Sequence, residues 1–251
     1  MHLRRITLLL FLILLGAAHG LAADRSVHVA TLNWEPYIGE RLDANGFGAA
    51  ILREAFRRAG YETTFTFMPW VRALKEAEIG KYDAVGFAYH STEREKKYIF
   101  SAAYAESVLG FAKLRKSDVK FATLQDLAPY RIGVVRGFVN TPEFDALESL
   151  HKEAVKNELM NLKKLVNGRV DLILIDKFIM RHLMRKHFPG QIDAVEFLDP
   201  PLAVHPLYLM FSRKHTYSET RVRAFNAAIE AMQRDGTTAT IMKHFGYVHA
   251  D

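Results

Sequence analysis

The pattern that most constrains the fold is an alternation of short apolar runs with longer segments whose apolar residues recur at helical spacing. Early in the chain, residues 27–32, 61–67 and 84–89 have the apolar or alternating pattern of strands, and residues 51–59 and 71–77 have that of helices. Strands that alternate with helices in this order are typical of an α/β domain with a largely parallel sheet. This part of the chain therefore predicts one α/β unit.

A second unit of the same kind begins beyond Lys120. Its predicted elements are, in order, a strand at 131–135, a helix from Thr141, a helix over 159–166, a strand at 170–175, a helix after Asp176 and a strand at 194–198. Thr141 has the position of an N-cap, because Pro142 follows it at the first helical position. A long amphipathic helix is predicted around 222–232. No linker rich in Gly or Ser separates the units, so we expect extended crossings near 110–114 and 207–211 to join them.

The first 23 residues have the layout of a secretory signal, with a basic start, an apolar stretch and then small residues. Ten apolar residues span only about 15 Å as a helix, which is half of a bilayer core, so we expect residues 1–23 to be a cleaved signal peptide rather than an anchor. Its removal takes away Arg4 and Arg5 and no acid, which lowers the formal net charge from 34 − 28 = +6 to 32 − 28 = +4.

The chain contains no cysteine, which excludes disulfides, thiolate metal sites and a cysteine nucleophile. A secreted chain without cysteine also cannot be acylated as a lipoprotein. We therefore expect a soluble protein of the periplasm.

Missing patterns exclude several other functions. The chain has no phosphate-binding loop, dinucleotide fingerprint, nucleophile elbow or zinc-helix motif, and its eleven histidines are scattered, so we expect no cofactor and no metal. The densest basic cluster, at Arg181, Arg185 and Lys186, fits the solvated end of a helix better than a nucleic-acid groove. We expect no nucleic-acid partner.

One run of sequence resembles a known family. Residues 83–94, DAVGFAYHSTER, with Phe100-Ser101 and Tyr104 after them, resemble a signature of the type II periplasmic solute-binding proteins, family 3, the polar amino-acid-binding branch of ABC transporter substrate-binding proteins. In that signature a hydroxyl residue stands three positions before an arginine, and Ser91 and Arg94 hold those places. Four further matches follow the order of the family: Trp34 with Tyr37, Trp70, residues 133–137, and residues 168–171 followed by Asp176.

The resemblance implies an α/β fold of two lobes, joined by two hinge strands, with a ligand cleft between them. On this basis we expect lobe 1 to comprise residues 24–114 and 207–251, and lobe 2 to comprise residues 115–206. It also implies a small-molecule ligand, an ABC permease of the inner membrane as partner, and a monomer.

The resemblance further implies a site for a zwitterionic amino acid. Arg94 would hold the ligand carboxylate with two parallel hydrogen bonds, and Asp176 would hold the ammonium group. Backbone N–H groups at the helix start near Asn140 and Thr141 would add an anion-friendly terminus from the opposite lobe.

Aromatic residues complete the expected site. Trp34 and Trp70 would enclose the ligand side chain by burying its area, or by cation–π contact if it is cationic. Tyr89, which lies within the signature run, is also expected to contact the ligand, whereas Tyr37 and Glu35 are expected to be structural or rim residues.

Each of the main residues also has a structural interpretation. Arg94 could pair with Glu93 or Glu95 at the surface, and Asp176 could serve as the N-cap of the following helix. Either tryptophan could pack within its own lobe.

The sequence departs from the family pattern at the end of the predicted strand 84–89. Where binders of basic amino acids usually have small hydroxyl residues, this chain has Gly86 and Phe87, and where they often have Gln it has Arg136. Arg136 belongs to the expected site and adds positive charge near the cleft. Together with Arg72, it motivates the hypothesis that the ligand is neutral or acidic.

Three functions are compatible with these features. The first is a non-catalytic periplasmic receptor that delivers a polar amino acid or related solute to a permease. The second is an enzyme on the same scaffold, similar to cyclohexadienyl dehydratases, with Asp176 or Glu35 as the acid. The third is a sensor that reports ligand occupancy to a partner protein.

Overall fold

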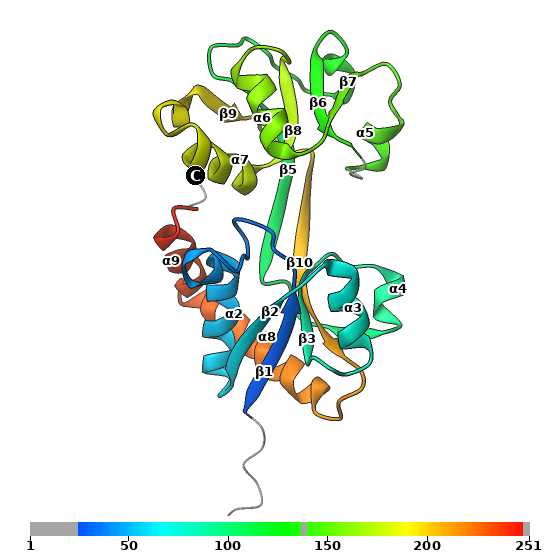
Figure 1. Ribbon diagram of the computed structural model, residues 1–251, viewed down its shortest axis with the longest axis vertical. Helices are drawn as coiled ribbons and strands as arrows, with labels where there is room; N and C mark the ends of the chain where they lie inside the picture. The colour runs from blue at the N-terminus through cyan, green and yellow to red at the C-terminus, as the bar shows by residue number, and fades with distance from the viewer. Residues whose placement is uncertain (1–24, 137–139, 248–251) are drawn as a thin grey trace, which may run out of the picture.

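The computed structural model describes residues 25–136 and 140–247, and it contains two α/β lobes stacked along the long axis of the molecule (Figure 1). The predicted signal peptide, residues 1–23, lies outside the described residues. One path of hydrogen-bonded strands runs through both lobes in the order β2-β1-β3-β10-β5-β8-β6-β7.

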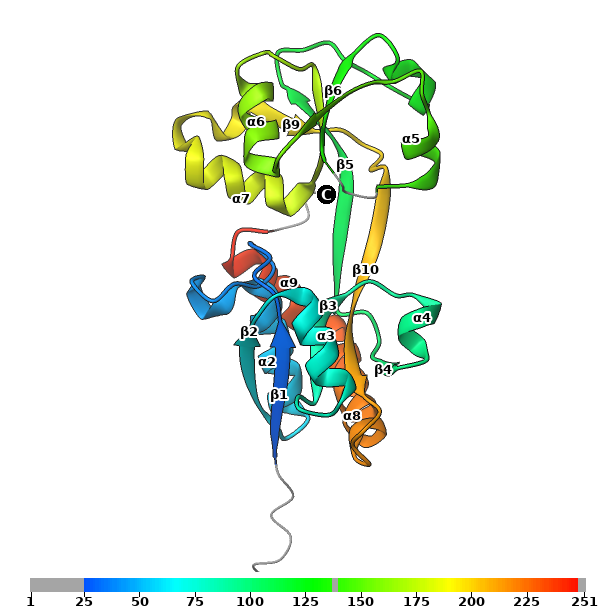
Figure 2. The same cartoon turned by 45° about the vertical axis from the view of Figure 1, so that its right-hand side comes forward.

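Lobe 1 is built on three parallel strands, β1 (Ser26–Thr31), β2 (Glu62–Phe67) and β3 (Ala84–Ala88). Helices α2 (Phe47–Arg58) and α8 (Ser218–Arg234) pack on one face of these strands, and α3 (Trp70–Glu78) packs on the other (Figure 2). Side chains of successive strand residues point to opposite faces, so Val29 joins the core under α2 while Ala30 joins the core under α3. Because helices cover both faces, every residue of β3 is buried.

Lobe 2 repeats this plan with three further parallel strands, β6 (Arg131–Val135), β7 (His151–Val155) and β8 (Leu172–Asp176). Helices α6 (Glu158–Val166) and α7 (Lys177–His187) cover one face, and α5 (Pro142–Ala146) lies on the other. All five residues of β8 are buried. The remaining elements of the described chain are η1 (Asp43–Asn45), α4 (Thr92–Glu95), β4 (Tyr98–Phe100), η2 (Leu124–Leu127), η3 (Pro189–Ala194), β9 (Val195–Phe197) and α9 (Thr237–His244).

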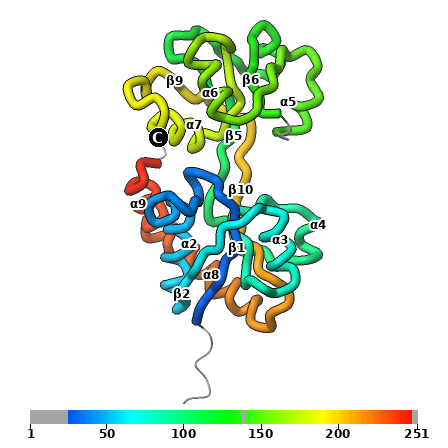
Figure 3. Tube along the Cα trace, viewed as in Figure 1, coloured from blue at the N-terminus to red at the C-terminus, as the bar shows by residue number. Residues whose placement is uncertain are grey.

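Two long strands, β5 (Ala105–Leu114) and β10 (Ala203–Ser212), connect the lobes (Figure 3). They pair with each other antiparallel over residues 105–109 and 203–207. Beyond this stretch β5 pairs with β8 of lobe 2, and β10 pairs with β3 of lobe 1. β5 therefore extends the sheet of lobe 2, β10 extends that of lobe 1, and their mutual pairing joins the two sheets. The lobe limits at residues 114 and 206 stay a prediction.

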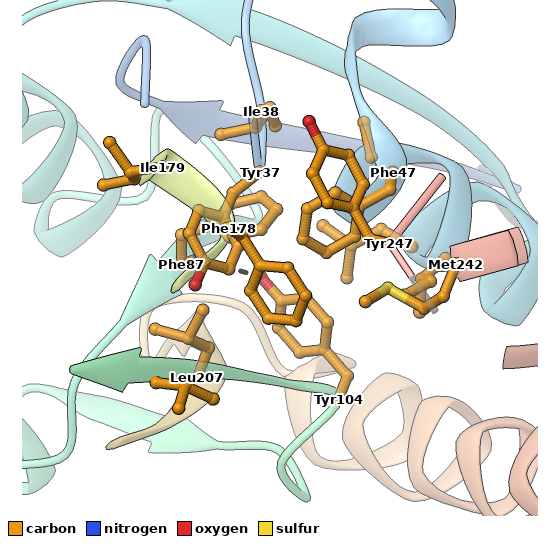
Figure 4. Close-up of a cluster of buried hydrophobic side chains, with 14 of the residues drawn as sticks. Tyr37, Ile38, Phe47, Phe87, Tyr104, Phe178, Ile179, Leu207, Met242 and Tyr247 are labelled. Atoms are coloured by element: carbon orange, nitrogen blue, oxygen red, sulfur yellow. Dashed lines mark hydrogen bonds between the residues drawn. The ribbon is translucent and has the colours of Figure 1, made fainter. Parts of the chain in front are cut away.

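A cluster of aromatic side chains joins the lobes beside these two strands (Figure 4). Phe178, at the start of α7, lies 5.8 Å from the ring of Tyr37 and 5.7 Å from that of Phe47, both in lobe 1. Tyr247, near the end of the described chain, lies 5.5 Å from Phe178. The largest buried core of the molecule is consequently shared by both lobes.

The predicted α/β, two-lobed fold is confirmed, and so are the predicted strands and helices. Thr141 caps α5 by accepting a hydrogen bond from the N–H of Phe144, and Gly60 follows α2 with the positive φ of 83° that ends a helix cleanly. Strand β7 was not predicted. Its sequence, HKEAV, is mostly polar because β7 is the edge strand of the sheet and faces solvent. No helix within the described residues is long and apolar enough to span a membrane.

Candidate functional site

A cavity of about 350 Å³ lies where β5 and β10 cross between the lobes. Its walls come from the loop after β1, the end of β3, both crossing strands and the inner edge of lobe 2. The lining residues are Trp34, Tyr89, Ser107, Leu109, Val135, Asn140, Glu158, Leu174, Ile175, Asp176, Ile179 and His205. Four of the eight predicted site residues, Trp34, Tyr89, Asn140 and Asp176, are among them.

Asp176 is buried at the end of β8 and caps α7. Its Oδ1 accepts the backbone N–H groups of Phe178 at 2.8 Å and Ile179 at 3.0 Å. Its Oδ2 accepts the hydroxyls of Tyr37 at 2.7 Å and Ser107 at 2.8 Å. Burial raises the pKa of the carboxyl group above its ordinary value, although these four hydrogen bonds act in the opposite direction. The N-cap role is therefore present, and the ligand role stays a prediction.

Trp34 and Tyr89 form the aromatic wall of the cavity on the lobe 1 side. The ring of Trp34 stacks on that of Tyr37 at 4.5 Å, which fixes its orientation, and meets Tyr89 edge-on at 6.2 Å. The hydroxyl of Tyr89 donates to Oγ of Ser107 at 3.2 Å, and its ring lies 5.1 Å from that of His205. Flat apolar surface is thus presented to anything that enters the cavity.

Arg94 and Trp70 do not belong to the described lining. Nη1 of Arg94 donates to the backbone oxygen of Tyr89 at 2.6 Å, and its guanidinium lies 5.4 Å from the ring centre of Trp70. Burial lowers the pKa of Arg94 from its usual value. Arg94 is therefore held against its own lobe, next to the lining residue Tyr89, and its role as a carboxylate ligand stays a prediction.

The predicted residues at the start of α5 have partners of their own. The backbone N–H and the Nδ2 group of Asn140 both donate to the carboxylate of Asp145, at 2.9 and 2.8 Å. Thr141 caps the helix, and the side chain of Arg136 is exposed. Asn140 alone of these three residues lines the cavity.

Gly86 and Phe87, two of the residues that depart from the family pattern, also lie outside the described lining. Phe87 is buried, with a φ of 63° that bulky residues rarely adopt, and its ring covers Gly48, where a Cβ would collide with it. Its N–H donates to the hydroxyl of Tyr104 at 3.0 Å. Phe87 thus fills the core of lobe 1 at the point where β3 ends.

Several lining residues were not predicted from the sequence. Ser107 and Leu109 lie on one face of β5, in the part that precedes the crossing predicted at residues 110–114. Glu158 and His205 carried no signal in the sequence, because neither lies in a matching motif.

Glu35, expected at the rim, bridges the lobes beside the cavity. Its Oε2 lies 3.1 Å from Nε2 of His182 and 2.9 Å from Nζ of Lys186, both on α7. The hydrogen bond from Lys186 lowers the pKa of Glu35, and burial lowers that of His182. Within the described residues, no three acidic or histidine side chains gather as they would around a metal ion.

Two α/β lobes, two crossing strands and a cavity between them define the class of two-lobed solute-binding proteins. The sequence profile of the bacterial extracellular solute-binding proteins, family 3, matches residues 27–247, so the chain belongs to that family. A search of curated proteins finds no match.

Solved structures with the same fold cover most of the chain. The second substrate-binding domain of GlnP from Lactococcus lactis, in an open conformation, is 15% identical, with a TM-score of 0.75 over 92% of this chain and 98% of that one. The L-cystine receptor of Neisseria gonorrhoeae, unliganded and open, is 18% identical, with a TM-score of 0.74 over 90% and 94%. An ancestral cationic amino-acid solute-binding protein is 20% identical, with a TM-score of 0.70 over 88% and 95%. At these identities the likeness shows the fold.

Proposed function

We propose that this protein is a periplasmic receptor that binds a polar amino acid or a related small solute by closure of its lobes and presents it to an ABC-type permease. The observation that carries the proposal is the position of the cavity, whose walls come from both lobes and from both strands that join them. The names of the structural neighbours, which include a cystine receptor and a cationic amino-acid binder, support the ligand class.

Closure follows from the shared lining. A ligand that touches Trp34 or Tyr89 on one side and Asn140 or Ile179 on the other makes more contacts when the lobes approach. The ligand therefore favours the closed state by the difference between its affinities for the closed and open states. The motion would be a bend of β5 and β10, the two strands that join the lobes, and hinge bending of this kind closes two domains around a ligand.

A dehydratase-like activity is less well supported by the geometry. Asp176 already accepts four hydrogen bonds, and Glu35 is paired with His182 and Lys186. Both candidate acids are thus engaged in contacts within the protein, which gives the enzyme less support than the receptor. A sensory role through a partner would use the same closure.

The experiment is a thermal-shift panel on the protein without residues 1–23, covering the twenty amino acids, small peptides and organic acids. A ligand at 100 times its dissociation constant stabilises the folded state by about 2.7 kcal/mol and raises the melting temperature. Any hit is then titrated by calorimetry, where micromolar affinity corresponds to about −8 kcal/mol. If no compound shifts the melting temperature, receptor function for this class of solute is rejected. Turnover of prephenate or arogenate would favour the enzyme instead.

Arg94→Ala tests the predicted carboxylate ligand, with Arg72→Ala as the control. Both changes remove one positive charge from lobe 1, but Arg72 pairs with Glu76 at 2.7 Å on the outer face of α3. We expect Arg94→Ala to weaken binding by about 2–5 kcal/mol and Arg72→Ala to leave it unchanged. Equal affinities in the two variants would remove Arg94 from the site.

A further inference from the structure

The hydrogen-bonding capacity of Asp176 is already used within the protein. A carboxylate offers about four lone-pair positions, and each oxygen of Asp176 accepts two hydrogen bonds from the chain. Two of the donors are backbone N–H groups that the cap of α7 requires, and the other two are buried hydroxyls. A cationic group of a ligand would have to displace one of these donors to reach Asp176.

Glu158 is the other acidic residue that lines the same cavity. It is half-buried at the first position of α6, and among the described residues its side chain has no hydrogen-bond or ion-pair partner. The helix N-terminus favours its negative charge. Glu158 is therefore a carboxylate that lines the cavity and has no counter-ion in the part of the chain that the structure describes.

The rest of the described lining contains no Lys or Arg to balance it. None of the twelve lining residues is Lys or Arg, and the walls are apolar at Leu109, Leu174 and Ile179. Nearby, Arg94 is held by the backbone of Tyr89 and the ring of Trp70. The described cavity thus combines the carboxylate of Glu158 with apolar walls.

We propose that Glu158 selects the ligand, and that the ligand carries an ammonium or guanidinium group which pairs with this carboxylate. An aliphatic stem on the ligand would pack against Leu109, Leu174 and Ile179. A basic amino acid has this combination of groups. This inference rests on the proposed receptor function, and its ligand charge is the opposite of the one that Arg72 and Arg136 suggest from the sequence.

If Glu158 loses its charge, the cationic group of the ligand has no ion-pair partner at this half-buried position. Charged hydrogen bonds are about twice as strong as neutral ones, so we expect a loss of affinity of about 10- to 100-fold. An amino acid without a basic side chain would lose little, because it makes no such pair.

The test is calorimetric titration of the protein without residues 1–23 with L-arginine, L-lysine, L-glutamine, L-glutamate and L-leucine. Glu158→Gln keeps the shape of the side chain and removes its charge. Glu148→Gln is the control, because Glu148 is an exposed acid of lobe 2 outside the described cavity lining. Thermal melts of both variants establish that they are folded.

We expect arginine or lysine to bind the unaltered protein most tightly, to bind Glu158→Gln about 10- to 100-fold more weakly, and to bind Glu148→Gln as before. Binding of a neutral or acidic amino acid in preference, or equal affinity of Glu158→Gln for the basic ones, overturns the inference and leaves the receptor function standing. If neither these five nor any compound of the wider thermal-shift panel binds, the receptor function itself fails, and the inference with it.

Discussion

The hydroxyl of Tyr37 donates to Oδ2 of Asp176 across 2.7 Å, and both residues are buried. Tyr37 lies in the loop after β1, whereas Asp176 ends β8 and caps α7, so the bond joins the two lobes beside the cavity. Burial raises the pKa of Tyr37 well above its ordinary value, and the neighbouring carboxylate of Asp176 raises it further. The bond therefore links the loop after β1 in lobe 1 directly to the N-cap residue of α7 in lobe 2.

Tyr37→Phe should destabilise the protein by about 1–3 kcal/mol. The change removes one of the two hydroxyl groups that donate hydrogen bonds to the buried Oδ2 of Asp176. Urea unfolding at neutral pH measures the change. Tyr61→Phe is the control, since the hydroxyl of Tyr61 makes no hydrogen bond among the described residues. A loss in Tyr37→Phe no larger than in Tyr61→Phe would show that the bond adds nothing to stability.

Asp176 should make stability fall as pH rises. Burial raises its pKa above the ordinary value of 3.8, so between 3.8 and the raised pKa the folded state binds more protons than the unfolded state. The contribution is fully present below pH 3.8 and is lost as pH rises through the folded pKa. Free energies of unfolding at a series of acidic pH values should show this slope in the unaltered protein and lack it in Asp176→Asn. An identical slope in both proteins would assign it to other groups.

His182 should have the opposite effect in a higher range. Burial lowers its pKa from 6.5, so the unfolded state binds the proton more readily, and stability is lost as pH falls from 6.5 through the lowered value. We expect His182→Asn to flatten the dependence of the unfolding free energy on pH in this range. His151→Asn, at an exposed position of β7, should leave the dependence as it is. Retention of the full slope in His182→Asn would contradict the assignment.

Lobe 1 depends on a buried ion pair between Asp83 and Arg221, whose oxygen and nitrogen lie 2.7 Å apart. Asp83 also accepts the N–H of His28 at 2.7 Å and the hydroxyl of Tyr217 at 2.9 Å, which ties β1 and α8 to the start of β3. Asp83→Ala leaves Arg221 buried without this carboxylate and should cost about 3–5 kcal/mol of stability.

Chemical denaturation of Asp83→Ala and Glu93→Ala compares this buried pair with a surface one. Glu93 pairs with Lys96 at 2.9 Å, but both side chains are largely exposed, so Glu93→Ala should cost less than about 1 kcal/mol. Similar losses in the two variants would mean that the buried pair contributes no more to the free energy of unfolding than the exposed pair does.

The sequence predicted the fold well because its local signals agree with the final structure. The apolar run at 84–89 became β3, which helices cover on both faces, and Thr141 caps the helix it was expected to start. Edge strand β7 was missed, because an edge strand needs few apolar residues and so leaves no apolar pattern.

The candidate site was predicted only in part. Family resemblance directed attention to Trp34 and Asp176, which line the cavity, and their contact with a ligand stays a prediction. It gave no information on the direction of the Arg94 side chain, which depends on the backbone of Tyr89 and the ring of Trp70. Nor did it indicate Glu158, whose proposed role rests on its position in the cavity lining and on the lack of a partner within the described residues.

By itself, the sequence determined the order and kind of the strands and helices, because hydrophobic periodicity and capping residues act over a few positions along the chain. Only the tertiary structure decided which side chains meet at the cavity. Trp34, Glu158 and His205 come together there because β5 and β10 cross between the lobes, and a contact between residues so far apart in sequence depends on the packing of the whole chain. The same packing gives Asp176 four hydrogen-bond donors and leaves the side chain of Glu158 without a partner among residues 25–136 and 140–247.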